Sequence, residues 1–263
     1  MSLRKLLRSL QIFFPFLQDA RFAFERYRQK AGQRLVEPDF GALRLFDWGA
    51  APLFLDIGAN RGLATDAMRL LVPDARIIAF EPNPLLYRQL TRIYSAVTTV
   101  SCMDIALGNA STEAVLWVPV YRNWVFDGLG SLDRRKAAEW LDSDQLYFFD
   151  ARHLQLHEQS CRIRRLDELA LSPAFIKIDV QGHELAVLRG AEETLRRCRP
   201  LLMIENTGEG AETAFLRECG YTICAFEHGR LSMSRGGRVN SLFVTAEHLE
   251  RLTGLEPELS AGR

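Results

Sequence analysis

The chain has 263 residues, and 33 Lys and Arg side chains balance 33 Asp and Glu, so its formal net charge is zero. This balance argues against a protein that binds nucleic acid mainly by neutralising phosphates, because such proteins carry a strong basic excess. Hydrophobic residues make up 48% of the chain and charged residues 25%, which excludes disorder and collagen-like repeats and favours one large α/β domain with additions.

The first segment is basic and rich in aromatic residues. Residues 1–34 contain eight Lys or Arg against two acidic residues, a net charge of +6. The apolar run Leu10–Leu17 is too short to span a bilayer, and no clear signal-peptide cleavage site follows it. We expect residues 1–50 to form a helical extension of a cytoplasmic protein. Two interpretations stay open: a cap that packs on the domain, or a surface that contacts the inner face of the membrane through residues 1–34.

From residue 51 to residue 250, short apolar runs alternate with helix-like stretches and predict the main domain. The runs are Leu53–Ile57, Arg76–Phe80, Thr98–Cys102, Ala174–Ile178, Pro200–Ile204, Tyr221–Phe226 and Val239–Thr245. Such alternation is typical of a mostly parallel sheet with right-handed crossovers. Residues 108–173 interrupt it, and we interpret them as an insertion that covers the site. Residues 251–263 are a C-terminal tail.

In doubly wound sheets, ligands bind where the strands end, near the point at which the strand order reverses. The first run ends in Asp56, and Ile57-Gly58-Ala59-Asn60-Arg61-Gly62 follows. Gly58 and Gly62 allow a tight turn and a close approach of the backbone to a ligand. Asn60 replaces the second glycine of the dinucleotide fingerprint. The loop therefore favours a nucleoside ligand without a pyrophosphate over an NAD-linked sugar oxidoreductase.

The next two strand ends are predicted to hold that nucleoside. Glu81, followed by Pro82, ends the second run, where a carboxylate can accept hydrogen bonds from both ribose hydroxyls. Asp104 follows the third run, with Ile105 and Ala106 after it. We expect the Asp104 carboxylate to accept a hydrogen bond from the adenine amine, while the two apolar side chains pack on the ring.

The fourth and fifth runs end in ionisable residues. Lys177 and Asp179 alternate onto one face of the fourth strand, His183 begins the next helix, and Glu205 ends the fifth run. His183 is the first candidate for a general base, because its ordinary pKa of about 6.5 suits neutral pH. Asp179 would orient it or act itself, and a buried Lys177 would keep Asp179 charged. The alternative is an internal ion pair beside a solvated helix start.

The same strand ends could also offer ligands to a divalent cation. Asp179, Glu205 and Asn206 offer the oxygen ligands that a hard cation prefers. Their spacing is loose, and we predict no metal ligands.

The insertion contains residues that could bind a sugar. Six of them are aromatic and three are charged: Tyr121, Trp124, Phe126, Trp140, Tyr147, Phe148, Asp127, Asp133 and Arg134. The aromatic rings would stack on the apolar face of the sugar, and the charged groups would bind its hydroxyls. The alternative is a subsidiary aromatic core.

Between residues 53 and 245 the chain resembles the FkbM family of S-adenosylmethionine-dependent methyltransferases. The matching strings are FLDIGANRG, IIAFEPNP, ALG at 106–108, RRLDEL at 164–169 and FIKIDVQGHELAVLRGAEETL at 175–195. The last string is long and highly specific. One departure is Gln181, where the family more often has Glu.

The resemblance implies a Rossmann-like seven-stranded methyltransferase sheet with helices on both faces. It also implies transfer of a methyl group to a hydroxyl of a sugar, glycan or related natural product. The expected partners are that small-molecule or glycan acceptor and, as one way to cover the basic segment, a second copy in a homodimer. The alternative function is a catalytically inactive methyltransferase-like protein that docks on a partner or membrane.

Overall fold

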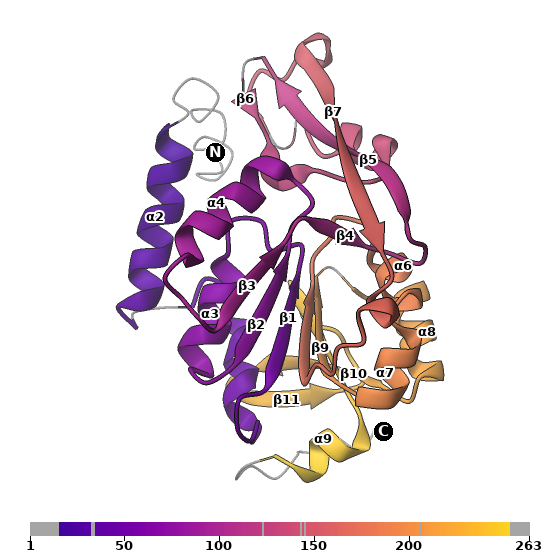
Figure 1. Cartoon of the computed structure of the whole chain (residues 1–263). Helices are drawn as coiled ribbons and strands as arrows, with labels where there is room; N and C mark the ends of the chain where they lie inside the picture. The colour runs from indigo at the N-terminus through magenta and orange to yellow at the C-terminus, as the bar shows by residue number, and fades with distance from the viewer. Residues whose placement is uncertain are drawn as a thin grey trace.

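The computed structural model describes residues 16–32, 35–122, 124–142, 144, 146–205 and 207–252 (Figure 1). In this part of the chain the larger sheet has eight strands in the order β11-β10-β12-β9-β8-β1-β2-β3. Their bounds are β1 (Leu53–Ile57), β2 (Arg76–Phe80), β3 (Val100–Met103), β8 (Phe175–Ile178), β9 (Leu201–Glu205), β10 (Thr222–Glu227), β11 (Arg230–Met233) and β12 (Asn240–Val244). Strands β3, β2, β1, β8 and β9 are parallel, whereas β12, β10 and β11 run antiparallel to their neighbours.

Each of the seven predicted runs forms a strand of this sheet, which confirms the doubly wound α/β fold. The sheet has one strand more than expected, because β11 folds back on β10. The two residues between them, His228 and Gly229, both have positive φ (51° and 81°), which suits the twist of a tight hairpin. Strand β11 is short and mixes Arg230 and Ser232 with apolar residues, so its sequence pattern is weak.

Helices cover both faces of the large sheet, as predicted. One apolar cluster joins the sheet to α6 (Glu184–Arg189), α7 (Glu192–Cys198) and α8 (Ala211–Glu218). A second cluster joins the opposite face to η1 (Pro38–Leu45) and α3 (Leu63–Leu71). Because side chains alternate along a strand, the even-numbered Asp56 of β1 points to the side of η1 and α3. Its parallel partner in the β1–β8 register is Lys177, which faces the same way.

The insertion folds as a second sheet with the strand order β4-β7-β5-β6. Its strands are β4 (Ile105–Leu107), β5 (Thr112–Tyr121), β6 (Trp124–Val125) and β7 (Leu154–Arg164), and its helices are η2 (Asp127–Leu129), α5 (Arg134–Glu139) and η3 (Ala151–His153). The predicted strand Glu113–Val120 is confirmed as part of β5. Strand β7 was not predicted, because polar residues stand on both of its faces. Figure 1 shows this sheet at one end of the larger one.

Part of the basic N-terminal segment packs on the domain. Helix α2 (Phe16–Lys30) lies beside α3, where Arg26 Nε donates to Asp66 Oδ2 at 2.5 Å and Gln29 Nε2 donates to the Leu63 carbonyl at 3.0 Å. Gln29 is fully buried, so this part of the segment is a cap. Residues 1–15, 33 and 34 lie outside the described part. No helix within the described residues is both long and apolar enough to cross a membrane.

Candidate active site

A cavity of about 650 Å³, including its open mouth, lies at the carboxyl ends of β1, β2 and β8 beneath the insertion. The sequence-predicted residues that line it are Gly58, Asn60, Glu81, Pro82, Ile105, Ala106, Asp179 and His183. Helix α4 (Pro84–Tyr94) contributes Leu86, and the insertion contributes Leu116 and Leu132. The strand ends therefore supply the polar side of the cavity, and β4, α4 and the insertion supply its apolar side.

Glu81 ties two loops together at this cavity. Its carboxylate accepts hydrogen bonds from the backbone N–H of Asn60 at 2.7 Å and of Asn83 at 2.9 Å. The side chain is almost fully buried, and burial raises its pKa to about 7 although both hydrogen bonds oppose the rise. A carboxylate accepts through two oxygens with about four lone-pair directions, so each oxygen can accept one hydroxyl more. Glu81 is therefore placed to bind a diol.

Gly58 holds the ends of β1 and β8 together. Its φ is +84°, and a Cβ on it would lie 1.9 Å from the backbone oxygen of Asp179. The sequence suggested that this glycine admits a ligand, whereas the structure shows that it first admits the neighbouring strand. Gly62, at the N-terminus of α3, also has positive φ, and its carbonyl accepts a hydrogen bond from Tyr94 Oη at 2.8 Å. Gly62 does not line the cavity.

A second cavity lies on the face of β1 and β8 that η1 and α3 cover. It is lined by Phe22, Glu37, Asp56, Ala59, Lys177 and others, and Gly58, Asn60 and Asp179 line both cavities. Asp56 accepts a hydrogen bond from Thr65 Oγ1 at 2.5 Å, and burial raises its pKa to about 6. The predicted pair of Lys177 and Asp179 is present, with Nζ and Oδ2 3.9 Å apart.

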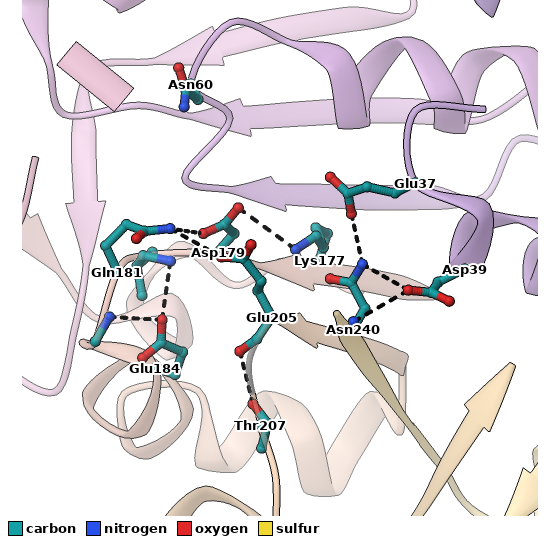
Figure 2. Close-up of polar contacts among 12 residues, drawn as sticks. Glu37, Asp39, Asn60, Lys177, Asp179, Gln181, Glu184, Glu205, Thr207 and Asn240 are labelled. Atoms are coloured by element: carbon teal, nitrogen blue, oxygen red, sulfur yellow. Dashed lines mark hydrogen bonds and ion pairs between the residues drawn. The ribbon is translucent and has the colours of Figure 1, made fainter. Parts of the chain in front are cut away.

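Three side chains meet where β8 and β9 end (Figure 2). Gln181 Nε2 donates to Asp179 Oδ1 at 2.6 Å and to Glu205 Oε2 at 3.0 Å. Burial and the Asp179 carboxyl raise the pKa of Glu205 to about 8. Asn206 lies outside the described residues. Among those that are described, no group of three or more His, Cys, Asp and Glu side chains is arranged to hold a metal.

His183 lies half-buried at the start of α6, where it also lines the main cavity. Burial lowers its pKa, and the charge of Lys136 adds to this effect. The imidazole is therefore neutral at pH 7 and able to accept a proton. Its Nε2 lies 3.1 Å from the position that a Cβ on Gly108 would take, so the glycine of the ALG string makes room for the ring.

Asp104 corrects one prediction. Its side chain is exposed, pairs with Arg162 Nη2 at 2.8 Å and lines a separate surface groove with Tyr87. The chain leaves the large sheet after Met103 and enters β4 at Ile105, so Asp104 stands at the crossing and points away from the cavity. The neighbouring Ile105 and Ala106 are buried and line the cavity as predicted.

The prediction that aromatic rings of the insertion stack on a sugar is wrong for three of the six residues. Tyr121, Trp124 and Phe126 pack into a buried subsidiary core, which leaves their rings unavailable to a ligand. Phe148 is exposed. Of the three charged candidates only Asp127 lines the cavity, because Asp133 caps α5 and Arg134 lies over the Trp117 ring.

Sequence reasoning missed the contact between Arg61 and Asp127. Arg61 Nη2 lies 2.6 Å from Asp127 Oδ2, and the Arg61 guanidinium lies over the ring of Phe22. The Arg61 side chain thus joins the loop after β1 to the insertion and to α2. The sequence signal at this position was an Asp-Gly pair at 127–128, which indicates a turn but does not indicate that Asp127 contacts Arg61.

The raised pKa values of three buried acids predict that the free energy of unfolding falls as pH rises. Asp56, Glu81 and Glu205 have folded-state pKa values raised to about 6, 7 and 8. The native state therefore holds protons that the unfolded chain has lost, so this stability is present below about pH 4 and is lost as pH rises through 8. Urea unfolding at pH 5, 7 and 9 should show a falling free energy of unfolding. Glu205→Gln should flatten the fall above pH 7, and an equal slope in both proteins would contradict the assignment.

Comparison with known proteins identifies a family. The model of the methyltransferase FkbM domain matches residues 56–223. The methyltransferase sdnD of Sordaria araneosa is 29% identical over 171 residues, which cover 54% of this chain and 61% of that protein. The antimetabolite synthetase AmbE of Pseudomonas aeruginosa is 30% identical over 182 residues, covering 60% of this chain and 8% of that protein. The chain thus spans about three fifths of one relative and a small part of the other.

Among solved structures, a methyltransferase FkbM from Methylobacillus flagellatus aligns with a TM-score of 0.44 and 15% identity, over 73% of this chain and 43% of that one. The family match extends from the end of β1 to the beginning of β10, which includes both cavities' strand-end residues and the insertion. The chain belongs to the FkbM family of methyltransferases.

Proposed function

We propose that this methyltransferase carries a methyl group from S-adenosylmethionine to a hydroxyl oxygen of a sugar, glycan or related natural product. The observation that carries the proposal is Glu81, a buried carboxylate that lines the cavity at the strand ends, in a chain of the FkbM family. A cationic sulfonium also suits the surroundings, because acidic side chains outnumber basic ones along the two cavities. The acids are Glu37, Asp56, Glu81, Asp127 and Asp179, and the cations are Arg61 and Lys177.

The residues of both cavities fit the cofactor. Glu81 would bind the ribose hydroxyls, and Ile105, Ala106 and Leu86 offer an apolar bed for adenine. The methionine part of the cofactor carries an ammonium group and a carboxylate. In the second cavity Asp56 and Glu37 would face the ammonium group, and Lys177 would face the carboxylate. Gly58 and Asp179 line both cavities, so a ligand that occupies both passes them.

When bound, S-adenosylmethionine supplies a methyl group that its sulfonium already activates. The chain must then hold the acceptor in line and keep water out, a role that we assign to the insertion because its Leu116 and Leu132 line the cavity. It must also take the hydroxyl proton. The candidates that line the cavity are His183 and Asp179, and Lys177 would keep Asp179 charged. Glu205 is a third candidate, because Gln181 links it to Asp179.

The second function is an inactive, docking methyltransferase-like protein. The intact cofactor residues argue against it, whereas Phe24 and Tyr27 on the outer side of α2 are exposed, as a docking surface would require. Contact with a membrane and a homodimer through residues 1–34 both remain predictions. Liposome binding and oligomeric state of a chain that lacks these residues would test them.

The proposed function predicts a methyl ether. We expect S-adenosylmethionine, but not NAD, to raise the melting temperature. With ¹³C-methyl S-adenosylmethionine and a panel of methyl hexosides, NMR should show a labelled O-methyl signal. A melting shift with NAD alone would contradict the proposal. So would cofactor binding with labelled methyl found only on nitrogen when amino sugars are included.

A further inference from the structure

The turn after β8 has an unusual backbone. Gln181 and Gly182 both have positive φ, 53° and 95°, a region that glycine adopts freely and glutamine rarely. Side chains of the insertion hold this turn. Ser131 Oγ donates to the Gln181 carbonyl at 3.2 Å, and Lys136 Nζ donates to the Gly182 carbonyl at 2.7 Å. The turn at Gln181 is therefore held by a segment 46 to 50 residues away in the chain.

That backbone directs the Gln181 side chain between two carboxyl groups (Figure 2). Both hydrogens of its amide nitrogen are used, one on Asp179 and one on Glu205. A glutamine amide has no more than two such donors, so the amide is fully committed to this pair. Residues rarely adopt left-handed conformations without a compensating role, and this bridge supplies one.

A buried cation lies behind the pair and makes an ion pair but no hydrogen bond within the described residues. Lys177 is 1% exposed, and within the described residues no hydrogen-bond acceptor reaches its Nζ. Its ion-pair partner is Asp179, 3.9 Å away. Lys177 lines the second cavity, and Asp179 lines both, so a ligand between the cavities would meet the Asp179 carboxylate.

The charges that face Glu205 come from two directions. Asp179 and Lys177 face it from β8 and the turn after it, and Glu37 faces it from the segment before η1. Glu37 is itself engaged, since it accepts a hydrogen bond from Asn240 Nδ2 at 2.7 Å. Burial and the Asp179 carboxyl raise the pKa of Glu205 to about 8, so Glu205 is largely protonated at neutral pH.

We propose that Gln181 is a positioning residue that fixes Asp179 and Glu205 as the carboxyl pair receiving the acceptor's proton. The step rests on the proposed function. The pair takes the proton of the hydroxyl whose oxygen bonds to the methyl carbon, as the carbon–sulfur bond breaks with its electrons left on sulfur. His183 is the competing base, and its Nε2 packs toward Gly108.

The first test uses the full chain without ligand. Infrared spectra between pH 6 and 10 should show neutral carboxyl bands that disappear as pH rises, because the pKa values of Glu81 and Glu205 are raised to about 7 and about 8. The component with a midpoint near 8 should be absent in Glu205→Gln. Gln181→Met keeps the length of the side chain but removes both donated hydrogen bonds. It should raise the midpoint by about one unit, because each lost hydrogen bond had favoured a carboxylate.

Two further variants separate positioning from general disturbance. Ser131→Ala should raise the midpoint less than Gln181→Met, since it loosens the turn without removing the bridge. Glu184→Gln is the matched control, because Glu184 accepts only backbone N–H groups of the same turn. Its midpoint should not move. A wild-type midpoint near the ordinary glutamate value, or an unmoved midpoint in Gln181→Met, would overturn the proposal.

The second test uses turnover. Gln181→Met should lower kcat about tenfold and leave the affinity for S-adenosylhomocysteine unchanged. The apparent pKa in the pH profile of kcat should rise by the same amount as the infrared midpoint. Full activity of Glu205→Gln together with loss in His183→Ala would place the base on His183 and overturn the pair. A chain that makes no methyl ether but passes the infrared test disproves the proposed function and not the carboxyl bridge, so the two failures are distinct.

Discussion

Replacing Gly58 by alanine is expected to cost about 3–5 kcal/mol of folding free energy and to abolish cofactor binding. The new Cβ would lie 1.9 Å from the Asp179 backbone oxygen, so the ends of β1 and β8 would have to separate. Backbone cannot yield as a flexible side chain does, and the two strands are neighbours through the whole register Phe54–Ile57. The separation would displace the residues that line both cavities.

Gly220 provides a matched control for this variant. Its φ of +85° nearly equals the +84° of Gly58, but a Cβ on Gly220 would have no neighbour within 4 Å. Gly220→Ala therefore carries only the left-handed backbone cost of about 1–2 kcal/mol. Urea unfolding and calorimetry with S-adenosylhomocysteine would measure both proteins. Equal destabilisation would show that conformation alone, and not the contact with Asp179, makes Gly58 necessary.

The strand ends could be predicted from the sequence because two independent signals coincide there. The short apolar runs predicted the strands. The polar residues that end or follow these runs predicted that Glu81, Asp179 and Glu205 lie at the same edge of the sheet. Strand alternation also placed Lys177 beside Asp179 correctly. These are local rules, so they need no knowledge of distant contacts.

Asp104 shows where local rules end. Its position after a strand was the same signal that placed Glu81, yet the chain changes sheets at this residue and the side chain pairs with Arg162. The partner lies 58 residues further on, in β7, whose pattern does not predict a strand. The contact between Arg61 and Asp127 was likewise hidden, because it depends on how the insertion folds over the loop.

Gln181 was visible in the sequence only as a departure from a family pattern. Nothing in its neighbours predicts a positive φ, which arises from contacts with Ser131 and with Lys136 through Gly182. The bridge between Asp179 and Glu205 therefore follows from tertiary structure. A site residue whose conformation is imposed by a distant insertion cannot be assigned a role from local sequence.

Glu81→Gln is expected to weaken S-adenosylmethionine binding at least about 100-fold. The variant loses two charge-assisted hydrogen bonds from the ribose hydroxyls, and the neutral amide replaces them only in part with weaker ones. The amide keeps one accepting oxygen for the backbone N–H of Asn60 or Asn83, and turns a donor toward the other. Asp104→Asn is the control. Its side chain lies outside the cavity, so its affinity should equal that of the wild type.

The pH dependence of binding tests the same carboxylate without mutation. Glu81 has a pKa raised to about 7, and ribose hydroxyls bind its ionised form, so binding below pH 7 must release a proton. Affinity should therefore fall up to about tenfold per pH unit below 7, and Glu81→Gln should remove this part of the dependence. Calorimetry in two buffers of different ionisation enthalpy counts the released protons. If the wild type and Glu81→Gln release the same number at pH 6, the proton comes from another group, with Asp56 the next to examine because its own pKa is raised to about 6.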